Sequence, residues 1–294
     1  GTDHFKKLSQ ELRIASPADK PLRMVAGAFF QRQSNDIYQD YQIPNLGPLM
    51  SVNGNPGTLW LTKQHRVDKD YALFGEVSYD LMENLTATAG VRGFKYDNTL
   101  IGFFGFGRNP GNGYTDTPYN GAWSSRTGVA GCFTTTGDRL RNAIATGGAL
   151  TFAPGAIPGT PCTNLGTWAN GKVNPVQAKG DGATYRFNLN WKPTSTVMVY
   201  GTVSKGFRPG GINRRADVAA YAPDFLINFE LGWKTTLAPG LRFNGAIYQQ
   251  EWKDFQFSFL GANSFTEIHN GPDARIKGVE MDLTYNGGGL FFNL

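Results

Sequence analysis

The sequence predicts an all-β protein, and within that class a transmembrane antiparallel β-barrel of which this chain forms a part. Three observations predict it. The composition is rich in aromatic and poor in charged residues, apolar and polar residues alternate in segments of strand length, and short connections alternate with long ones along the chain. Aromatic residues make up 13% and charged residues only 17% of the 294 residues, whereas soluble domains carry about 25% charged residues. The longest apolar stretches, such as 24–30, are far shorter than the roughly 20 residues of a membrane helix. Composition alone also fits a Gly-rich β-sandwich, so the pattern along the chain has to decide.

The clearest alternation of apolar and polar residues lies in 185–191 and 225–233. Apolar residues occupy every odd position from Tyr185 to Trp191 and from Phe225 to Trp233, whereas the even positions between them carry Arg, Asn, Glu, Gly or Leu226. We expect the apolar faces to contact lipid and the polar faces to line the lumen, because barrel strands alternate in this way. The same pattern predicts about ten strands, near residues 5–15, 22–38, 67–79, 85–97, 183–192, 196–207, 224–235, 241–256, 273–285 and from 289 onward.

The connections between these strands favour a barrel over a sandwich. Short turns at 16–21, 80–84, 193–195 and 236–240 alternate with long loops at 39–66, 98–182, 208–223 and 257–272. Because each antiparallel strand reverses the chain, every second connection lies on the same side. Outer-membrane barrels place tight turns on the periplasmic side and long loops outside the cell, so we expect the four long loops to be extracellular.

The long extracellular loop 98–182 is rich in Gly, Thr, Asn and Pro and contains both cysteines. Paired cysteines in such a loop indicate an oxidising compartment, and we expect Cys132 and Cys162 to form a disulfide; two free thiols are the alternative. Residues 138–145 are a candidate for a short helix.

Motifs for chemistry are missing or incomplete, and we expect no enzyme, no cofactor and no metal site. The segment 166–172 has the spacing of a phosphate loop, but Val173 stands where the motif needs Ser or Thr. The three histidines, His4, His65 and His269, are far apart and have no ligand-type neighbours in sequence. The net charge of +5 is spread along the chain without a Lys/Arg run, so nucleic acid is not an expected partner.

Several recognisable segments follow one another along the chain. The strand at 199–213 ends in Gly-Phe-Arg-Pro-Gly-Gly-Ile-Asn, and it is followed by Asn228-Phe-Glu-Leu-Gly-Trp-Lys234, Tyr248-Gln-Gln-Glu-Trp-Lys-Asp-Phe-Gln256 and Asn270-Gly-Pro-Asp-Ala-Arg-Ile-Lys-Gly-Val-Glu280. In this order these segments resemble late barrel strands of the TonB-dependent outer-membrane receptors. Earlier segments at 10–16, 72–77 and 85–92 fit the same pattern, so the resemblance covers most of the chain outside the loops.

The resemblance implies a barrel of about 22 strands around a plug domain in the outer membrane of a Gram-negative bacterium. It implies uptake of a scarce nutrient, such as a ferric siderophore, another metal chelate or another large ligand, powered through the partner TonB. About ten strands cannot close that barrel, and plug and TonB-box segments are absent from the sequence, so residues 1–294 are expected to be a partial barrel domain. A passive porin and a secreted β-sandwich binding module remain as alternatives.

The expected ligand-binding residues lie where the late barrel strand leaves the membrane. Arg208, Asn213, Arg214 and Arg215 cluster after Gly206, at the outer mouth, where an anionic ligand or the phosphates of lipopolysaccharide can meet them. The alternative is that these polar residues only anchor the end of the strand.

Overall fold

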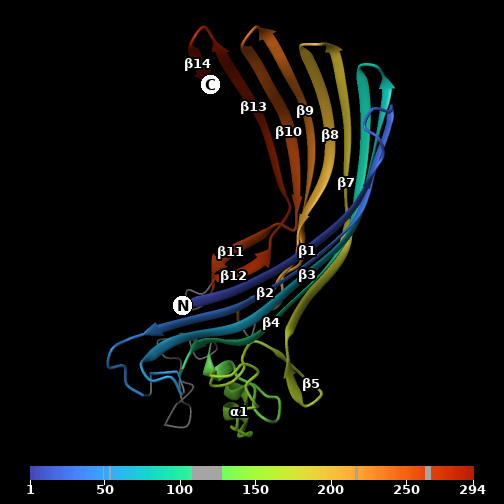
Figure 1. Cartoon of the computed structure of the whole chain (residues 1–294). Helices are drawn as coiled ribbons and strands as arrows, with labels where there is room; N and C mark the ends of the chain where they lie inside the picture. The colour runs from blue at the N-terminus through green and yellow to red at the C-terminus, as the bar shows by residue number, and fades with distance from the viewer. Residues whose placement is uncertain (49, 53, 108–127, 216–217, 262–265) are drawn as a thin grey trace.

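The computed structural model describes all residues except 49, 53, 108–127, 216–217 and 262–265. Ten strands form one curved antiparallel sheet in the order β1-β2-β3-β4-β7-β8-β9-β10-β13-β14 (Figure 1). Their bounds are Thr2–Ala15 (β1), Leu22–Gln42 (β2), Thr58–Met82 (β3), Leu85–Phe106 (β4), Val176–Thr194 (β7), Val197–Arg208 (β8), Asp224–Ala238 (β9), Leu241–Lys253 (β10), Ala274–Gly287 (β13) and Leu290–Asn293 (β14). Every strand pairs with the next sheet strand along the chain, so the predicted ten-strand meander is confirmed.

The strands run further towards the long connections than the sequence predicts. β3 begins at Thr58 and β4 ends at Phe106, so part of the loop expected at 98–182 belongs to β4 and β7, and the connection itself spans 107–175. Gly, Asn and Thr around positions 98–106 resemble turn residues in sequence, but each is held by ladder pairing with β3. Pro193 lies inside the bounds of β7, at a register shift in its pairing with β8, where a missing N–H costs the ladder little.

Two small hairpins lie within the connections. β5 (Thr167–Ala169) pairs with β6 (Lys172–Asn174), and β11 (Gln256–Leu260) pairs with β12 (Thr266–Asn270). The segment expected as an unstructured loop at 257–272 therefore contains a β-hairpin. Phe255, Phe257 and Phe259 alternate with Gln256 and Ser258, so the sequence does carry the pattern of a short strand there. Their rings lie next to one another, with centroids 5.5 and 5.7 Å apart.

The two faces of the sheet differ in the way that the alternation predicts. One face carries exposed apolar side chains, and we call it the outer face: Leu73, Val91, Phe187, Leu189 and Leu231. The opposite, inner face is mostly polar, and its Asn188 is only 9% exposed and donates a hydrogen bond of 2.7 Å to Thr202. The inner face also carries a buried cluster of Ala72, Phe94 and Tyr96 towards the loop end. Near the turn end, apolar side chains of the outer face are accessible, the reverse of a sheet that folds in water.

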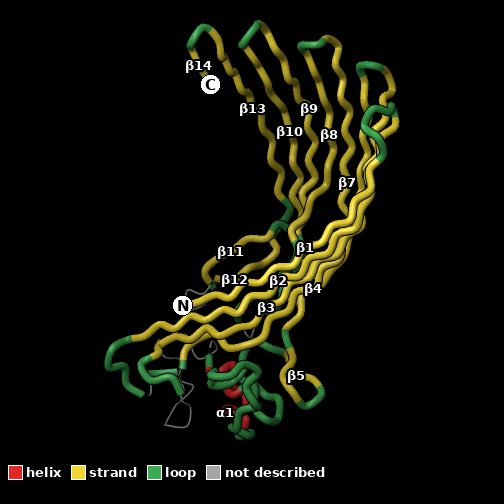
Figure 2. The backbone as a smooth tube through the Cα atoms, in the orientation of Figure 1, coloured by secondary structure: helices red, strands yellow, loops and turns green. Residues whose placement is uncertain are grey.

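The two ends of the sheet also differ. The turns at one end are confined to 16–21, 83–84, 195–196, 239–240 and 288–289, whereas the connections at the other end span 43–57, 107–175, 209–223 and 254–273. Figure 2 shows the tight turns at the top and the long connections, with the single described α-helix, at the bottom. We refer to these as the turn end and the loop end.

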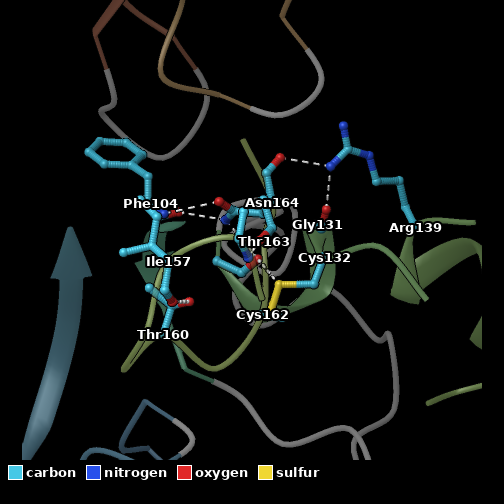
Figure 3. Close-up of a disulfide and its surroundings, with 11 residues drawn as sticks. Phe104, Gly131, Cys132, Arg139, Ile157, Thr160, Cys162, Thr163 and Asn164 are labelled. Carbon is cyan, nitrogen blue, oxygen red and sulfur yellow. Dashed lines mark hydrogen bonds between the residues drawn. A yellow bond between two sulfur atoms is a disulfide. The ribbon is translucent and has the colours of Figure 1, made fainter. Parts of the chain in front are cut away.

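The long connection after β4 folds into a small unit around a disulfide. Cys132 and Cys162 are bonded, with their Cα atoms 5.9 Å apart, and Asn164 donates from Nδ2 to the carbonyls of Phe104 and Gly128 at 2.8 and 2.9 Å (Figure 3). Arg139 donates to the carbonyls of Gly131 and Asn164 at 2.6 and 2.7 Å. The buried cluster of this unit includes strand residues as well as loop residues: Val52, Leu61, Phe103, Val129, Cys132, Leu140 and Cys162.

The short helix α1 (Leu140–Thr146) belongs to the same unit. It lies close to the predicted 138–145 and ends at Gly147, which adopts the left-handed conformation (φ 69°) that caps helices. No helix in the described ranges is long and apolar enough to cross a membrane.

Candidate functional site at the loop end of the sheet

The predicted site residues lie in the connection between β8 and β9. Gly211 and Tyr221 pair through backbone hydrogen bonds of 3.1 and 3.0 Å, which closes this connection into a narrow loop. Asn98 of β4, which is buried, donates from Nδ2 to the carbonyl of Gly210 at 3.1 Å. The loop is therefore fastened to the sheet at its base.

Asp224, the first residue of β9, organises this base. Its side chain is only 2% exposed and accepts hydrogen bonds from the Arg208 guanidinium, from Trp252 Nε1 at 2.9 Å and from the backbone N–H of Gln256 at 3.0 Å. Arg208 also lies over the Trp252 ring, 5.0 Å from its centroid. Since both charges have partners, Arg208 serves to join the ends of β8, β9 and β10.

Asn213 joins the loop to the hairpin β11–β12. Its side-chain amide donates to the carbonyl of Ile268 at 2.9 Å and accepts from the N–H of the same residue at 2.8 Å, as a neighbouring strand would. The same amide donates to the carbonyl of Ala219 at 2.8 Å. Asn213 thus fixes the hairpin against the loop.

Arg215 makes a second link to the hairpin. Its guanidinium forms an ion pair with Glu267 of β12, and both side chains are largely buried. A buried ion pair positions its two elements because separating the charges leaves each without compensation.

Gln256 and Asn270 complete the network from the hairpin side. Gln256 donates from Nε2 to the carbonyls of Pro209 and Ala222, each at 3.0 Å. Asn270 accepts from the N–H of Ala222 at 2.8 Å and donates to the carbonyl of Asp254 at 2.8 Å. The prediction of site residues did not include Asp224, Gln256 or Asn270. Gln256 and Asn270 nevertheless stand in the motifs that carry the family resemblance, and that was the signal in the sequence that they meet.

Arg214 differs from the other three predicted residues. It remains exposed to solvent although protein surrounds much of it, and the described part of the chain offers it no ion-pair partner. The surrounding protein lowers the pKa of Arg214, the like charge of Arg66 lowers it further, and Asp3 opposes this effect. An arginine keeps its charge despite such shifts, so Arg214 is an exposed cation. Arg66, by contrast, is paired with Asp68 at 2.8 Å.

The loop therefore approaches the inner face of the N-terminal strands. Arg66 of β3 lies two positions from Asp68, and Asp3 of β1 lies ten positions from Arg13. Both therefore lie on the same, inner face as Asp68 and Arg13, because the side-chain period of a strand is two. Figure 1 shows the hairpin β11–β12 leaving β10 and β13 and extending to the level of β1 and β2. The arrangement can hold an anionic ligand at Arg214. Within the described ranges no group of three or more His, Cys, Asp or Glu side chains gathers as a metal site.

The comparison with known families agrees with this architecture. Residues 6–294 match the family model described as TonB dependent receptor-like, beta-barrel. The chain belongs to the TonB-dependent receptor family. Members of this family are transport receptors in the outer membrane of Gram-negative bacteria, and this receptor barrel accordingly lies in that membrane.

Solved receptors share the fold at low sequence identity. The ferric yersiniabactin uptake receptor FyuA from Yersinia pestis superposes with a TM-score of 0.61 at 15% identity, over 98% of this chain and 33% of that one. The ferric-catecholate import receptor Fiu from E. coli gives 0.54 at 14%, over 96% and 35%. The FrpB iron transporter from Neisseria meningitidis gives 0.54 at 10%, over 99% and 34%. The receptor barrel segment thus spans about a third of the length of each of these proteins.

Proposed function

We propose that this receptor takes up a scarce, bulky nutrient such as a ferric siderophore or another metal chelate, with energy supplied through TonB. Family membership supports transport, and the solved relatives are named for ferric yersiniabactin, ferric catecholate and iron. The single observation that carries the ligand proposal is the exposed Arg214, a cation at the loop end of the sheet that has no ion-pair partner in the described part of the chain. Arg66, whose charge lowers the pKa of Arg214, is itself paired with Asp68 at 2.8 Å. A cation without an internal partner attracts an anionic ligand.

The polar network around Asp224 supports this role indirectly. It holds the loop 209–223 and the hairpin β11–β12 in place through hydrogen bonds and one buried ion pair. A fixed support lowers the entropy cost of binding, because fewer side chains have to be ordered when the ligand arrives. We infer that Arg208, Asn213 and Arg215 position the site, and that Arg214 contacts the ligand.

The transport step is tested in cells that carry the full-length receptor with and without TonB. Uptake of iron-labelled chelates of the catecholate, hydroxamate and phenolate classes is measured in both strains. We expect uptake of at least one class to require TonB. Equal uptake in the strain that lacks TonB contradicts active transport and favours the passive channel.

The ligand contact is tested with Arg214→Gln. One charge-assisted hydrogen bond is worth about 1.5–3 kcal/mol. We therefore expect the variant to bind the transported chelate at least about tenfold more weakly than the wild type, without loss of assembled receptor. Arg242→Gln is the matched control, since Arg242 is an exposed arginine at the turn end. If both variants bind equally well, Arg214 does not contact the ligand.

A further inference from the structure

A continuous row of aromatic rings runs from the end of β10 along the hairpin β11–β12. Trp252, Phe255, Phe257, Phe259 and His269 follow one another, with ring centroids 5.8, 5.5, 5.7 and 5.1 Å apart. We call this row the ring ladder. Each spacing lies in the range in which aromatic rings attract one another, so the rings hold one another in place.

The ring ladder begins on the inner face of the sheet. Ile247 of β10 is the ladder partner of Leu231, which lies on the outer face. Trp252 lies five positions further along the same strand, so its side chain is on the opposite, inner face. From there the hairpin extends to the level of β1 and β2 (Figure 1). The row therefore starts on the lumen side of the sheet and not on its lipid side.

One side of the hairpin is fastened to the rest of the molecule and the other side is open. Gln256 donates to carbonyls at the two ends of the loop 209–223, which ties its side of β11 to that loop. Phe257 and Phe259 alternate with Gln256, so they lie on the other side of the strand. Their side chains remain 37% and 42% exposed. The two rings are therefore accessible to a ligand.

Neighbouring residues fix the rings without covering them. His269 shares a hydrogen bond of 3.2 Å with Glu267, which in turn pairs with Arg215. At Gly271 an added Cβ atom would lie 2.8 Å from the ring of Phe255, so the absence of a side chain there lets the row pack against the backbone. Rings that are already ordered lose little conformational entropy when a ligand binds.

A cation lies beside the ring ladder. The side chain of Asn213 binds the backbone of Ile268, and the guanidinium of Arg215 pairs with Glu267. The backbone of Arg214, which stands between these two anchors, is therefore held next to β12. Since Arg214 is exposed, it offers a positive charge near the open rings.

We propose that Phe257, Phe259 and His269 form a stacking surface for a flat aromatic ligand, so that the receptor selects chelates built from aromatic, anionic groups. The inference rests on the proposed uptake of a metal chelate and narrows the class of that chelate. Catecholates and porphyrins present a π face to the rings and anionic oxygens to Arg214. Hydroxamates and citrate carry no ring and gain only from the burial of apolar area.

The proposal is tested by equilibrium binding of radioactive iron chelates to the full-length receptor in detergent. The probes are the ferric chelate of a hexadentate tris-catecholate, iron protoporphyrin and ferric citrate, all of which are anionic. We expect one of the two aromatic probes to bind more tightly than ferric citrate. Phe257→Leu/Phe259→Leu keeps apolar side chains but removes two rings. At roughly threefold or more per stacked ring, it should weaken binding of that aromatic probe by at least about tenfold.

The control variant is Phe187→Leu/Phe229→Leu, which makes the same change at two exposed positions of the outer face and should bind every probe like the wild type. Tighter binding of ferric citrate than of both aromatic probes overturns the proposal, as does failure of the wild-type receptor to bind either aromatic probe. An unchanged affinity of Phe257→Leu/Phe259→Leu for the aromatic probe also overturns it.

This inference and the proposed function can fail separately. If ferric citrate or a ferric hydroxamate is taken up through TonB while neither aromatic probe binds, the aromatic class is wrong and active uptake stands. If an aromatic probe binds through the rings but its uptake does not need TonB, active uptake is wrong and the stacking surface stands.

Discussion

Asp224 shows how one buried carboxylate organises several segments that are distant in sequence. It brings together Arg208, Trp252 and Gln256, which come from three different strands. Without this carboxylate, the donors of Trp252 and Gln256 would lie unpaired, and Arg208 would keep only the carbonyl of Gln256 as an acceptor. The three predicted ligand residues Arg208, Asn213 and Arg215 take part in such fixed contacts, so the chemistry left for a ligand concentrates on Arg214.

Replacing Asp224 with Ala should loosen the loop 209–223 without preventing barrel assembly. The change leaves the donors of Trp252 and Gln256 without an acceptor and removes the counter-charge of Arg208, which keeps only the carbonyl of Gln256. A lost buried partner costs about 1–3 kcal/mol. Hydrogen exchange of residues 209–223 should accelerate by at least tenfold. Asp19→Ala, at an exposed turn position, is the control, and equal protection in the two variants would contradict the assigned role of Asp224.

The assignment of the two faces can be tested by placing a single charged residue on either face. Leu189 is 46% exposed on the outer face, and its neighbour Asn188 lies on the inner face. A charge on the lipid side near mid-membrane costs about 2–4 kcal/mol, whereas Asn188→Arg loses hydrogen bonds worth about 0.5–1.5 kcal/mol each. We therefore expect Leu189→Arg to reduce the heat-modifiable, assembled fraction much more than Asn188→Arg. A larger defect in Asn188→Arg would contradict the assignment of the faces.

At the scale of residues, the sequence predicts on which face of the sheet a side chain lies, but not which other residue it contacts. Alternation places Leu189 and Asn188 on opposite faces because the side-chain period of a strand is fixed at two. It says nothing about which carboxylate meets Arg208, since that depends on where β9 and β10 end in space. Arg214 and Arg215 are equivalent in sequence, yet Glu267 on a distant hairpin pairs with Arg215 alone.

At the scale of elements, the connection after β4 is a folded unit on the end of a long hairpin. Its buried residues come from the connection and from the extensions of β3 and β4, Leu61 and Phe103. The strands extend past the apolar band because this unit covers them. Sequence periodicity missed the extensions, since their burial comes from a neighbour and not from a regular alternation.

The disulfide should hold this unit together. The disulfide closes a loop over a sequence separation of 30. On the chain-entropy model it lowers the entropy of the unfolded segment and so stabilises the folded unit by about 3–4 kcal/mol. Thiol labelling of the denatured, unreduced receptor should find neither Cys132 nor Cys162 reactive. After reduction, or in Cys132→Ser/Cys162→Ser, we expect faster protease cleavage near Gly147 with unchanged sheet content. Two reactive thiols before reduction would contradict the pairing.

At the scale of the whole molecule, three independent features distinguish the two ends of the sheet. The connections are short at one end and long at the other. The disulfide-bonded unit lies at the loop end, and disulfides form in oxidising compartments. The outer face carries Tyr79, Trp191 and Trp233 near the turn end, and charged pairs such as Lys69 with Asp97 towards the loop end. Each feature favours the same orientation, with the loop end outside the cell.

The orientation is tested with epitopes at both ends. One epitope is inserted at Gly147, where an added side chain meets no neighbouring atom, and the other after Asp19 in the exposed first turn. Because the strands reverse direction one after another, these positions lie on opposite sides of the membrane whatever the orientation. Antibody should bind intact cells that carry the Gly147 epitope, and should reach the Asp19 epitope only after the outer membrane is permeabilised. The reverse pattern would invert the orientation and place the candidate ligand site at Arg214 on the periplasmic side. Labelling of both epitopes on intact cells would contradict a membrane-spanning sheet altogether.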